Sequence, residues 1–311
     1  MERQLLLDFV HVTESSAIAA SKFYGRGDKI GADKAATEIM RDRFNAIAFS
    51  GTVVIGEGEK DKSAGLFHGE LVGTGGKKLD IVLDPIEGTT SVAEGRYDSF
   101  SVIVTAPSGT ILPVPGTYMD QIVVGAKAAE AISLNKTITK NLQDIAHALK
   151  KDIKDVTVVI LDRPRHEKII EEISKAGARI KLIDHGTVAA SIQVAMPDSG
   201  VDVLMGDAGA PEALLAACAL HCLGGNMSAR LRPHSEEFAE RARRMGISDF
   251  SRIYGMRDLV KSDECNFVAT GISDGLLLRG VKEYGNTIKT HSVIMRGKTK
   301  SIRFIETIRT K

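Results

Sequence analysis

Two carboxylates lie three residues apart directly after an apolar run. The run is Leu79–Leu83, and the hexapeptide that follows it, Asp84–Thr89, reads DPIEGT. We expect the run to be a buried strand, which Pro85 ends because proline has no N–H to donate. Gly88 and Thr89 then offer backbone N–H groups where a helix begins. Two oxygen ligands beside such an amide-lined anion site suit a metal ion that bridges a phosphate.

Further acidic residues stand next to turn signals elsewhere in the chain. They are Asp33, the group Glu57, Glu59 and Asp61, and Glu212, which follows a predicted strand and opens a predicted helix. Carboxylates at the carboxyl ends of strands converge on one edge of a layered sheet. Oxygen ligands without a cluster of His or Cys favour Mg²⁺ or Mn²⁺ over zinc. The alternative for each acid alone, and for the hexapeptide, is a turn residue or a cap on a helix terminus.

Two other patterns that resemble ligand-binding motifs are disfavoured. Gly73–Gly76 precedes a strand, and the glycines around Glu57 lack a third partner, so neither segment fits a nucleotide-binding loop. Cys218 and Cys222 share a helix face with His221 between them, but no second ligand pair accompanies them. We therefore predict packed thiols there and not a zinc site.

Charge and composition exclude several classes of function. The 311 residues carry 41 basic and 40 acidic side chains, a net charge of +1, which argues against a nucleic-acid or membrane-surface binder. The N-terminus has no signal-peptide pattern, and no apolar stretch approaches the ~18 residues of a membrane span. Three cysteines fit a reducing compartment. We expect a cytoplasmic protein.

The first half of the chain mixes helices with strands that need not alternate. Helical periodicity predicts helices over residues 5–20 and about 33–48. Residues 51–55 and 79–83 are predicted strands, residues 99–106 and 110–114 a hairpin, and residues 121–124 a further strand of the same sheet.

After about residue 150 predicted strands and helices alternate regularly. The strands are residues 156–161, 178–183 and 201–205, and the helices are 167–176, 186–194 and 210–222. Such alternation indicates a largely parallel sheet covered by helices. We therefore predict an α+β metal-binding domain over 1–150 and an α/β substrate-binding domain over 151–311, with the tail 266–305 completing the second sheet.

Five motifs occur together, in order, in a combination that resembles one known family. They are Gly56–Glu59, Asp84–Thr89, Tyr118-Met119, Arg163–His166 and Gly209–Glu212. The set is similar to that of the bacterial class II fructose-1,6-bisphosphatases, in the lithium-sensitive phosphatase superfamily, and covers nearly the whole chain. Some members also hydrolyse sedoheptulose 1,7-bisphosphate. The resemblance implies a layered αβαβα sandwich of the sugar phosphatase type, divalent-metal dependence with Mn²⁺ or Mg²⁺, and a homo-oligomer, a dimer or a tetramer.

The resemblance also implies roles for individual residues. It assigns the metal ligands to Asp33, Glu57, Asp84, Glu87, Glu212 and the carbonyl of Ile86. Asp61 and Thr89 match positions that orient or deprotonate the attacking water. Substrate contacts fall on Glu87, Gly88, Thr89, Tyr118, Arg163, Pro164, Arg165, His185, Gly186, Thr187 and Gly209. Two arginines that flank a proline are also chemically suited to holding a phosphate; the alternative is a solvated turn.

The chain departs from the family pattern at two turns. His185-Gly186-Thr187 stands where the family usually has Asp-Gly-Asp, and Asp207 stands where the family usually has a small residue. The metal ligands are therefore all present, while part of the sugar pocket is altered.

These residues favour a metal-dependent sugar-bisphosphate 1-phosphatase that converts fructose 1,6-bisphosphate to fructose 6-phosphate and phosphate. One alternative is a phosphatase for another sugar or inositol phosphate, for example sedoheptulose 1,7-bisphosphate. A second alternative is a non-catalytic paralogue that binds sugar phosphates and regulates. Retention of every catalytic carboxylate argues against the second alternative.

Overall fold

A computed structural model describes residues 3–57 and 65–311, and their contacts divide the chain into two compact units. Unit 1 comprises residues 1–111 and 262–311, and unit 2 comprises residues 112–261. The predicted boundary at residue 150 falls inside unit 2. None of the helices in the described residues combines the length and apolar composition that a membrane span requires.

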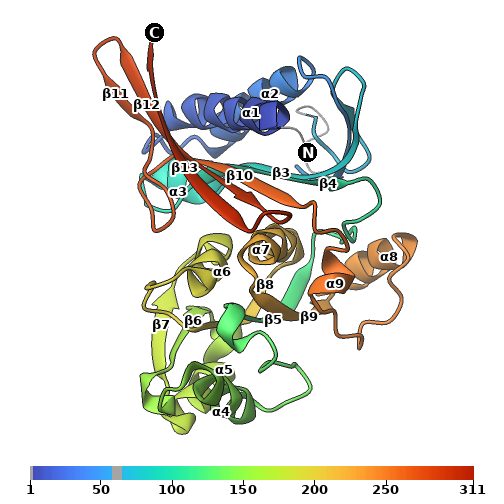
Figure 1. Cartoon of the computed structure of the whole chain (residues 1–311), viewed down its shortest axis with the longest axis vertical. Helices are drawn as coiled ribbons and strands as arrows, with labels where there is room; N and C mark the ends of the chain where they lie inside the picture. The colour runs from blue at the N-terminus through green and yellow to red at the C-terminus, as the bar shows by residue number, and fades with distance from the viewer. Residues whose placement is uncertain (1–2, 58–64) are drawn as a thin grey trace. The chain divides into compact units, whose positions relative to one another are not determined.

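Unit 1 is a mixed sheet with two long helices on one face (Figure 1). Within the described residues the sheet has eight strands in the order β11-β12-β10-β4-β3-β1-β2, with β13 paired to β12. The elements of unit 1 are α1 (Arg3–Ser21), α2 (Lys29–Phe44), β1 (Ser50–Ile55), β2 (Leu71–Val72), β3 (Lys78–Glu87), α3 (Thr89–Glu94), β4 (Phe100–Pro107), β10 (Asn266–Gly271), β11 (Lys282–Tyr284), β12 (Thr287–Arg296) and β13 (Ser301–Thr310).

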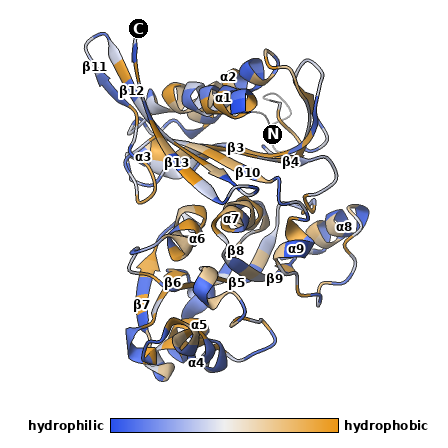
Figure 2. Cartoon of the chain, viewed as in Figure 1, coloured by the Kyte–Doolittle hydropathy of each residue, from blue (hydrophilic) through white to orange (hydrophobic). Residues whose placement is uncertain are grey.

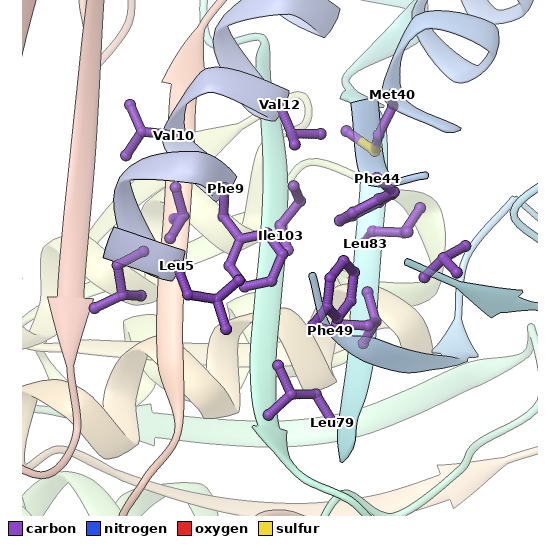
Figure 3. Close-up of a cluster of buried hydrophobic side chains, with 14 of the residues drawn as sticks. Leu5, Phe9, Val10, Val12, Met40, Phe44, Phe49, Leu79, Leu83 and Ile103 are labelled. Atoms are coloured by element: carbon purple, nitrogen blue, oxygen red, sulfur yellow. The ribbon is translucent and has the colours of Figure 1, made fainter. Parts of the chain in front are cut away.

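The main core of unit 1 joins α1 and α2 to the central strands. Phe9 of α1 meets Phe49 edge-on, with ring centroids 5.1 Å apart, and Phe44 of α2 closes the cluster. Leu79 and Leu83 of β3 belong to the same buried cluster as these rings (Figure 3). This buried face fixes β3, and therefore fixes where its carboxyl end emerges.

Unit 2 is a five-stranded sheet, within the described residues, in the order β7-β6-β8-β5-β9. Helices α4 and α5 pack on one face, and α6 and α7 lie on the other (Figure 1). The elements of unit 2 are β5 (Tyr118–Val124), α4 (Ile138–Leu149), β6 (Thr157–Leu161), α5 (Glu167–Ala176), β7 (Arg179–Ile183), α6 (Thr187–Ala195), β8 (Val203–Gly209), α7 (Ala210–Leu223), β9 (Asn226–Arg232), α8 (Glu236–Arg244) and α9 (Met256–Leu259).

Hydropathy separates the buried helices of unit 2 from the exposed ones. Helix α7 is hydrophobic over most of its length and α8 is mostly hydrophilic (Figure 2). Cys218 and Cys222 are buried on α7, which agrees with the predicted packing of their side chains. The α/β sandwich class predicted from the sequence is confirmed by these two sheets and their helices.

Three predictions about strand membership are wrong. The tail adds β10, β12 and β13 to the sheet of unit 1, where β10 pairs with β4, and does not complete the second sheet. Strand β5 pairs with β8 and β9 in unit 2, and not with the strands of unit 1. Residues 112–114 are not a strand, so the predicted hairpin does not form. In the first two cases the partner of the strand is distant in sequence, so the local pattern carries no information about it.

Candidate active site

The carboxyl end of β3 places the hexapeptide beside the end of β1. Strands β1 and β3 run parallel, with Ile55 opposite Val82, so Glu57 and Asp84 emerge at the same edge of the sheet. The prediction that Pro85 ends the strand is wrong. The β3–β4 pairing skips Pro85 and Ile86 and resumes with Glu87 opposite Phe100. Such a bulge bends the strand and re-aims its side chains without ending the pairing.

Local hydrogen bonds hold the hexapeptide in its shape. The Ile86 N–H donates to Asp84 Oδ1 at 2.9 Å, and the Thr89 hydroxyl donates to the Ile86 carbonyl at 3.2 Å. Gly88 has φ +90°, a left-handed conformation that favours glycine, and it caps the start of α3. The Ser99 hydroxyl donates to the Gly88 carbonyl at 3.0 Å. Helix α3 therefore begins at Thr89, where the sequence places a helix start.

Asp33 lies on α2, close to the hexapeptide. The helix starts at Lys29, four residues before the predicted start, because the Asp28 side chain caps it by accepting from the Gly31 N–H at 2.8 Å. Lys29 Nζ donates to Thr90 Oγ1 at 2.9 Å, which ties the start of α2 to the start of α3. The residue before Asp33, Ala32, packs in one buried cluster with Ile86 of the hexapeptide.

The predicted metal ligands are distributed unevenly over the two units. Asp33, Glu57, Asp84, Ile86 and Glu87 belong to unit 1, and Glu212 belongs to unit 2. In the part of the chain that the structure describes, no three His, Cys, Asp or Glu side chains gather tightly enough to hold a metal ion. Asp61 lies outside the described residues.

The environment of the Glu212 carboxylate shows whether this residue suits a metal ion. Its Oε2 atom is buried and accepts no hydrogen bond from the described residues. Burial raises the pKa of this carboxyl above its usual value of 4.5, because the charged form loses its hydration. A divalent cation bound to that oxygen would supply the missing compensation. The carboxylate therefore has the environment expected of a metal ligand.

The predicted substrate residues of unit 2 come together at one edge of its sheet. Strand β6 runs parallel to both β7 and β8, so the turns that follow these three strands share the carboxyl edge. Tyr118 begins the antiparallel strand β5 opposite Gly209, and so lies at the same edge. This edge collects four of the predicted segments, which are Tyr118, Arg163–Arg165, His185–Thr187 and Gly209.

The two arginines of the β6–α5 turn make different contacts. Arg163 donates to the carbonyls of Asp162, at 2.8 Å, and of Asp184, so it braces the turn that carries His185. Arg165 donates to the Asp207 carbonyl at 3.3 Å and lies over the Tyr118 ring, 4.9 Å from its centroid. Each guanidinium has five N–H donors, so both keep donors for a ligand.

The altered turn at residues 185–187 opens α6. Gly186 caps the helix in a left-handed conformation, and Thr187 is its first residue and is buried. Pro164 starts the short 3₁₀ turn that precedes α5. The departure at Asp207 lies on β8 opposite Asp120, which forms an ion pair with Arg230 at 2.8 Å.

Two histidines beside these residues have no role in the sequence-based assignment. His166 is buried and hydrogen-bonded through both ring nitrogens. The His234 ring lies 5.1 Å from that of Tyr118 and 4.1 Å from that of Phe238, and its Nδ1 is 3.2 Å from the Thr117 hydroxyl. His166 directly follows Arg165 in the sequence, and this adjacency could have marked it as a candidate. His234 is far from Tyr118 in the sequence, and no feature of the sequence pointed to it.

A cavity of about 560 Å³ in unit 1 lies elsewhere. Its lining includes Tyr24, Tyr97, Asp274 and Lys282, and it contains none of the residues that the sequence selects for catalysis or binding.

Comparison with known proteins gives one consistent result. The family model described as bacterial fructose-1,6-bisphosphatase, glpX-encoded, matches residues 3–309. Fructose-1,6-bisphosphatase 1 class 2 of Escherichia coli (strain K12) is 41% identical over 322 aligned residues, which cover 99% of this chain and 96% of that protein. Fructose-1,6-bisphosphatase class 2 of Shigella flexneri matches with the same identity and coverage.

Proposed function

Because the chain belongs to the bacterial fructose-1,6-bisphosphatases of the glpX-encoded family, we propose that it hydrolyses fructose 1,6-bisphosphate to fructose 6-phosphate and phosphate. The family is metal-dependent. The observation that carries the proposal furthest is the sheet edge of unit 2, where Arg163, Arg165 and Tyr118 occur together at the carboxyl ends of parallel strands. Ligands bind at such edges in α/β proteins.

We propose that the metal ligands are the carboxylates of Asp33, Glu57, Asp84, Glu87 and Glu212 and the carbonyl of Ile86. Bound Mn²⁺ or Mg²⁺ would polarise the attacking water and stabilise the oxygen that leaves phosphorus. The hard oxygen donors of this set suit either ion. Phosphate release from the chelated protein, after separate addition of each ion, identifies the one that supports the higher rate.

We propose that Thr89 orients the attacking water. Its hydroxyl proton is already donated to the Ile86 carbonyl, so its oxygen is left as an acceptor. An acceptor at that position would accept a hydrogen bond from the water and so aim a lone pair of the water oxygen at phosphorus. The water oxygen gives up a proton and forms the new bond to phosphorus as the bond from phosphorus to the C1 oxygen of the sugar breaks, and the departing C1 oxygen takes up a proton from solvent. Asp61 is the residue we propose as the proton acceptor.

The arginine turn would hold the phosphate that does not react. Arg165 presents its remaining donors beside Tyr118, and Arg163 stabilises the neighbouring turn. Binding energy from this distal phosphate positions the scissile one. Glu87, Gly88 and Thr89 in unit 1, and Pro164, His185, Gly186, Thr187 and Gly209 in unit 2, complete the proposed substrate contacts. We further propose a homo-oligomer, a dimer or a tetramer, in the cytoplasm.

A phosphate-release assay over a substrate panel tests this function. The panel contains fructose 1,6-bisphosphate, sedoheptulose 1,7-bisphosphate, fructose 6-phosphate and an inositol monophosphate, each with Mn²⁺ and with Mg²⁺. We expect the two bisphosphates to be hydrolysed and the monophosphates to react far more slowly. Release from the inositol phosphate alone would replace the proposed substrate class. No release from any substrate with either ion would favour a binding protein without catalytic activity.

A further inference from the structure

The side chain of His166 is held by one backbone group on each side of its ring. The side chain is 1% exposed. Its Nδ1 lies 2.9 Å from the Leu161 carbonyl, and the Asp207 N–H donates to its Nε2 at 2.9 Å. A carbonyl only accepts and a backbone N–H only donates, so Nδ1 carries the proton and Nε2 is the acceptor. Both ring nitrogens are therefore occupied by contacts within unit 2.

These contacts join two turns that are more than forty residues apart in the chain. The Asp207 backbone makes one hydrogen bond with each of two consecutive residues, because its N–H donates to His166 and its carbonyl accepts from Arg165 at 3.3 Å. The 3₁₀ turn Pro164–His166 and the end of β8 are thus joined at a single residue, Asp207. The position of the Arg165 guanidinium depends on the position of the backbone at that residue.

Gly206 makes the fit between the two turns tight. Its φ is +114°, which side chains rarely adopt, and a Cβ there would lie 3.0 Å from His166 Nε2. Any side chain at residue 206 would push on the ring and on the Asp207 N–H that follows. The close approach of backbone and imidazole therefore requires glycine at this position.

We propose that His166 is a positioning residue that holds Arg165 in the geometry needed to bind the distal phosphate of the substrate. The proposal rests on the proposed function, since it concerns the same bisphosphate site. His166 acts by accepting from the Asp207 N–H, and it does not touch the substrate. Its effect should therefore be on KM for the bisphosphate, and it should require Arg165.

Two isosteric replacements separate the acceptor at Nε2 from the donor at Nδ1. In His166→Gln the terminal amide reaches the Nε2 position and can accept from Asp207, whereas in His166→Asn the amide reaches only the Nδ1 position and the Leu161 carbonyl. We expect His166→Asn to raise KM about tenfold with kcat nearly unchanged, and His166→Gln to stay close to wild type. His147→Asn, at an exposed histidine of α4, is the control for the substitution itself.

Gly206→Ala tests the contact from the opposite side. This substitution keeps the histidine at residue 166 but pushes its ring away from the Asp207 N–H. It should therefore raise KM by a factor similar to that of His166→Asn. If His166 served stability alone, these substitutions would instead lower the melting temperature of the protein without a selective effect on KM.

A double-mutant cycle with Arg165→Ala decides between positioning and general stability. If His166 acts through Arg165, His166→Asn should add little to the KM of Arg165→Ala, whereas independent effects would multiply. Equal effects of His166→Asn and His166→Gln, or fully multiplicative effects with Arg165→Ala, would overturn the proposal. If the wild-type protein released no phosphate from the bisphosphate, the proposed function would be overturned. The double-mutant cycle would then be measured on the dissociation constant of the bisphosphate in place of KM.

Discussion

The candidate residues of the two units are held in place in different ways. In unit 1 the hexapeptide is shaped by bonds within itself, from Ile86 to Asp84 and from Thr89 to Ile86. In unit 2 the proposed substrate residues come from four separate segments, joined by contacts such as that of Arg165 with Asp207. A locally stabilised motif can be recognised in a sequence, whereas a site built from several turns depends on strand pairing. We therefore expect variants in unit 1 to affect turnover, and variants in unit 2 to affect substrate binding and choice.

Removing a carboxylate of unit 1 should have the largest effect. Asp84→Asn or Glu57→Gln should lower kcat by at least about a hundredfold, because an anionic ligand is lost from the proposed metal site. Phosphate release measures the effect, and circular dichroism should report an intact fold. Asp42→Asn, at an exposed acid of α2, is the matched control. Half of the wild-type rate in buffer containing a chelator would rule out the metal mechanism.

Removing the hydroxyl of Thr89 should slow turnover without weakening binding. We expect Thr89→Ala to lower kcat by about a hundredfold with little change in KM, because the acceptor for the attacking water is lost. Thr89→Ser should restore most of the rate. The neighbouring Thr90→Ala, which removes only an exposed contact with Lys29, serves as the comparison. An unchanged kcat for Thr89→Ala would remove this residue from the mechanism.

Removing an arginine of unit 2 should act mainly on KM. Arg165→Ala should raise KM for the bisphosphate by about tenfold or more, the value of a charge-assisted phosphate contact. Arg163→Ala should also raise KM, and should in addition alter substrate choice, because Arg163 braces the Asp184 turn. Steady-state kinetics on both bisphosphates separate these outcomes. Variants with normal KM but no turnover at saturating substrate would reverse the roles assigned to the two units.

The altered turn of unit 2 should control which sugar is preferred. Fructose 1,6-bisphosphate should be hydrolysed by the unmodified protein, and the double change His185→Asp with Thr187→Asp should shift kcat/KM toward it by about tenfold. A carboxylate at residue 187 would stand in the first turn of α6, where the helix dipole tolerates it. The control is Asp184→Asn, at an exposed residue just before the turn. A strong preference that the double change leaves untouched would exclude this turn from the sugar pocket.

The smallest effect, measured on the stability of the metal-free protein, should come from the charge of Glu212. The pKa of the Glu212 carboxyl in the folded state lies above its usual value, because burial disfavours the charged form. The charge therefore lowers the free energy of unfolding, by an amount that grows as the pH rises through 4.5. Glu212→Gln should therefore stabilise the metal-free protein at neutral pH by about 1 kcal/mol, and the gain should vanish in acid. Denaturant unfolding in the presence of a chelator measures this difference. A gain independent of pH would mean that the carboxylate is not the cause.

The sequence by itself determined the elements and the motifs. The residue pattern predicts α1, β1, the buried part of β3 and the alternation from β6 to α7, because each depends on the periodicity of nearby residues. The helix start at Thr89 also follows from its neighbours, and the motifs identify the family. The early start of α2, the absence of a strand over residues 112–114 and the extent of β3 past Pro85 were not foreseen. In β3 the Asp84 side chain accepts from the Ile86 N–H within a bulge, and a local sequence pattern does not show such a bulge.

The tertiary structure alone decided which segments share a sheet and which side chains meet. A strand's own pattern does not reveal its partner, so the transfer of the tail to unit 1 and of β5 to unit 2 could not be foreseen. The same holds for the bracing of the Asp184 turn by Arg163 and for the contact of His166 with Asp207. These contacts join segments that are far apart in the chain, and they exist only because parallel strands bring their carboxyl ends to one edge.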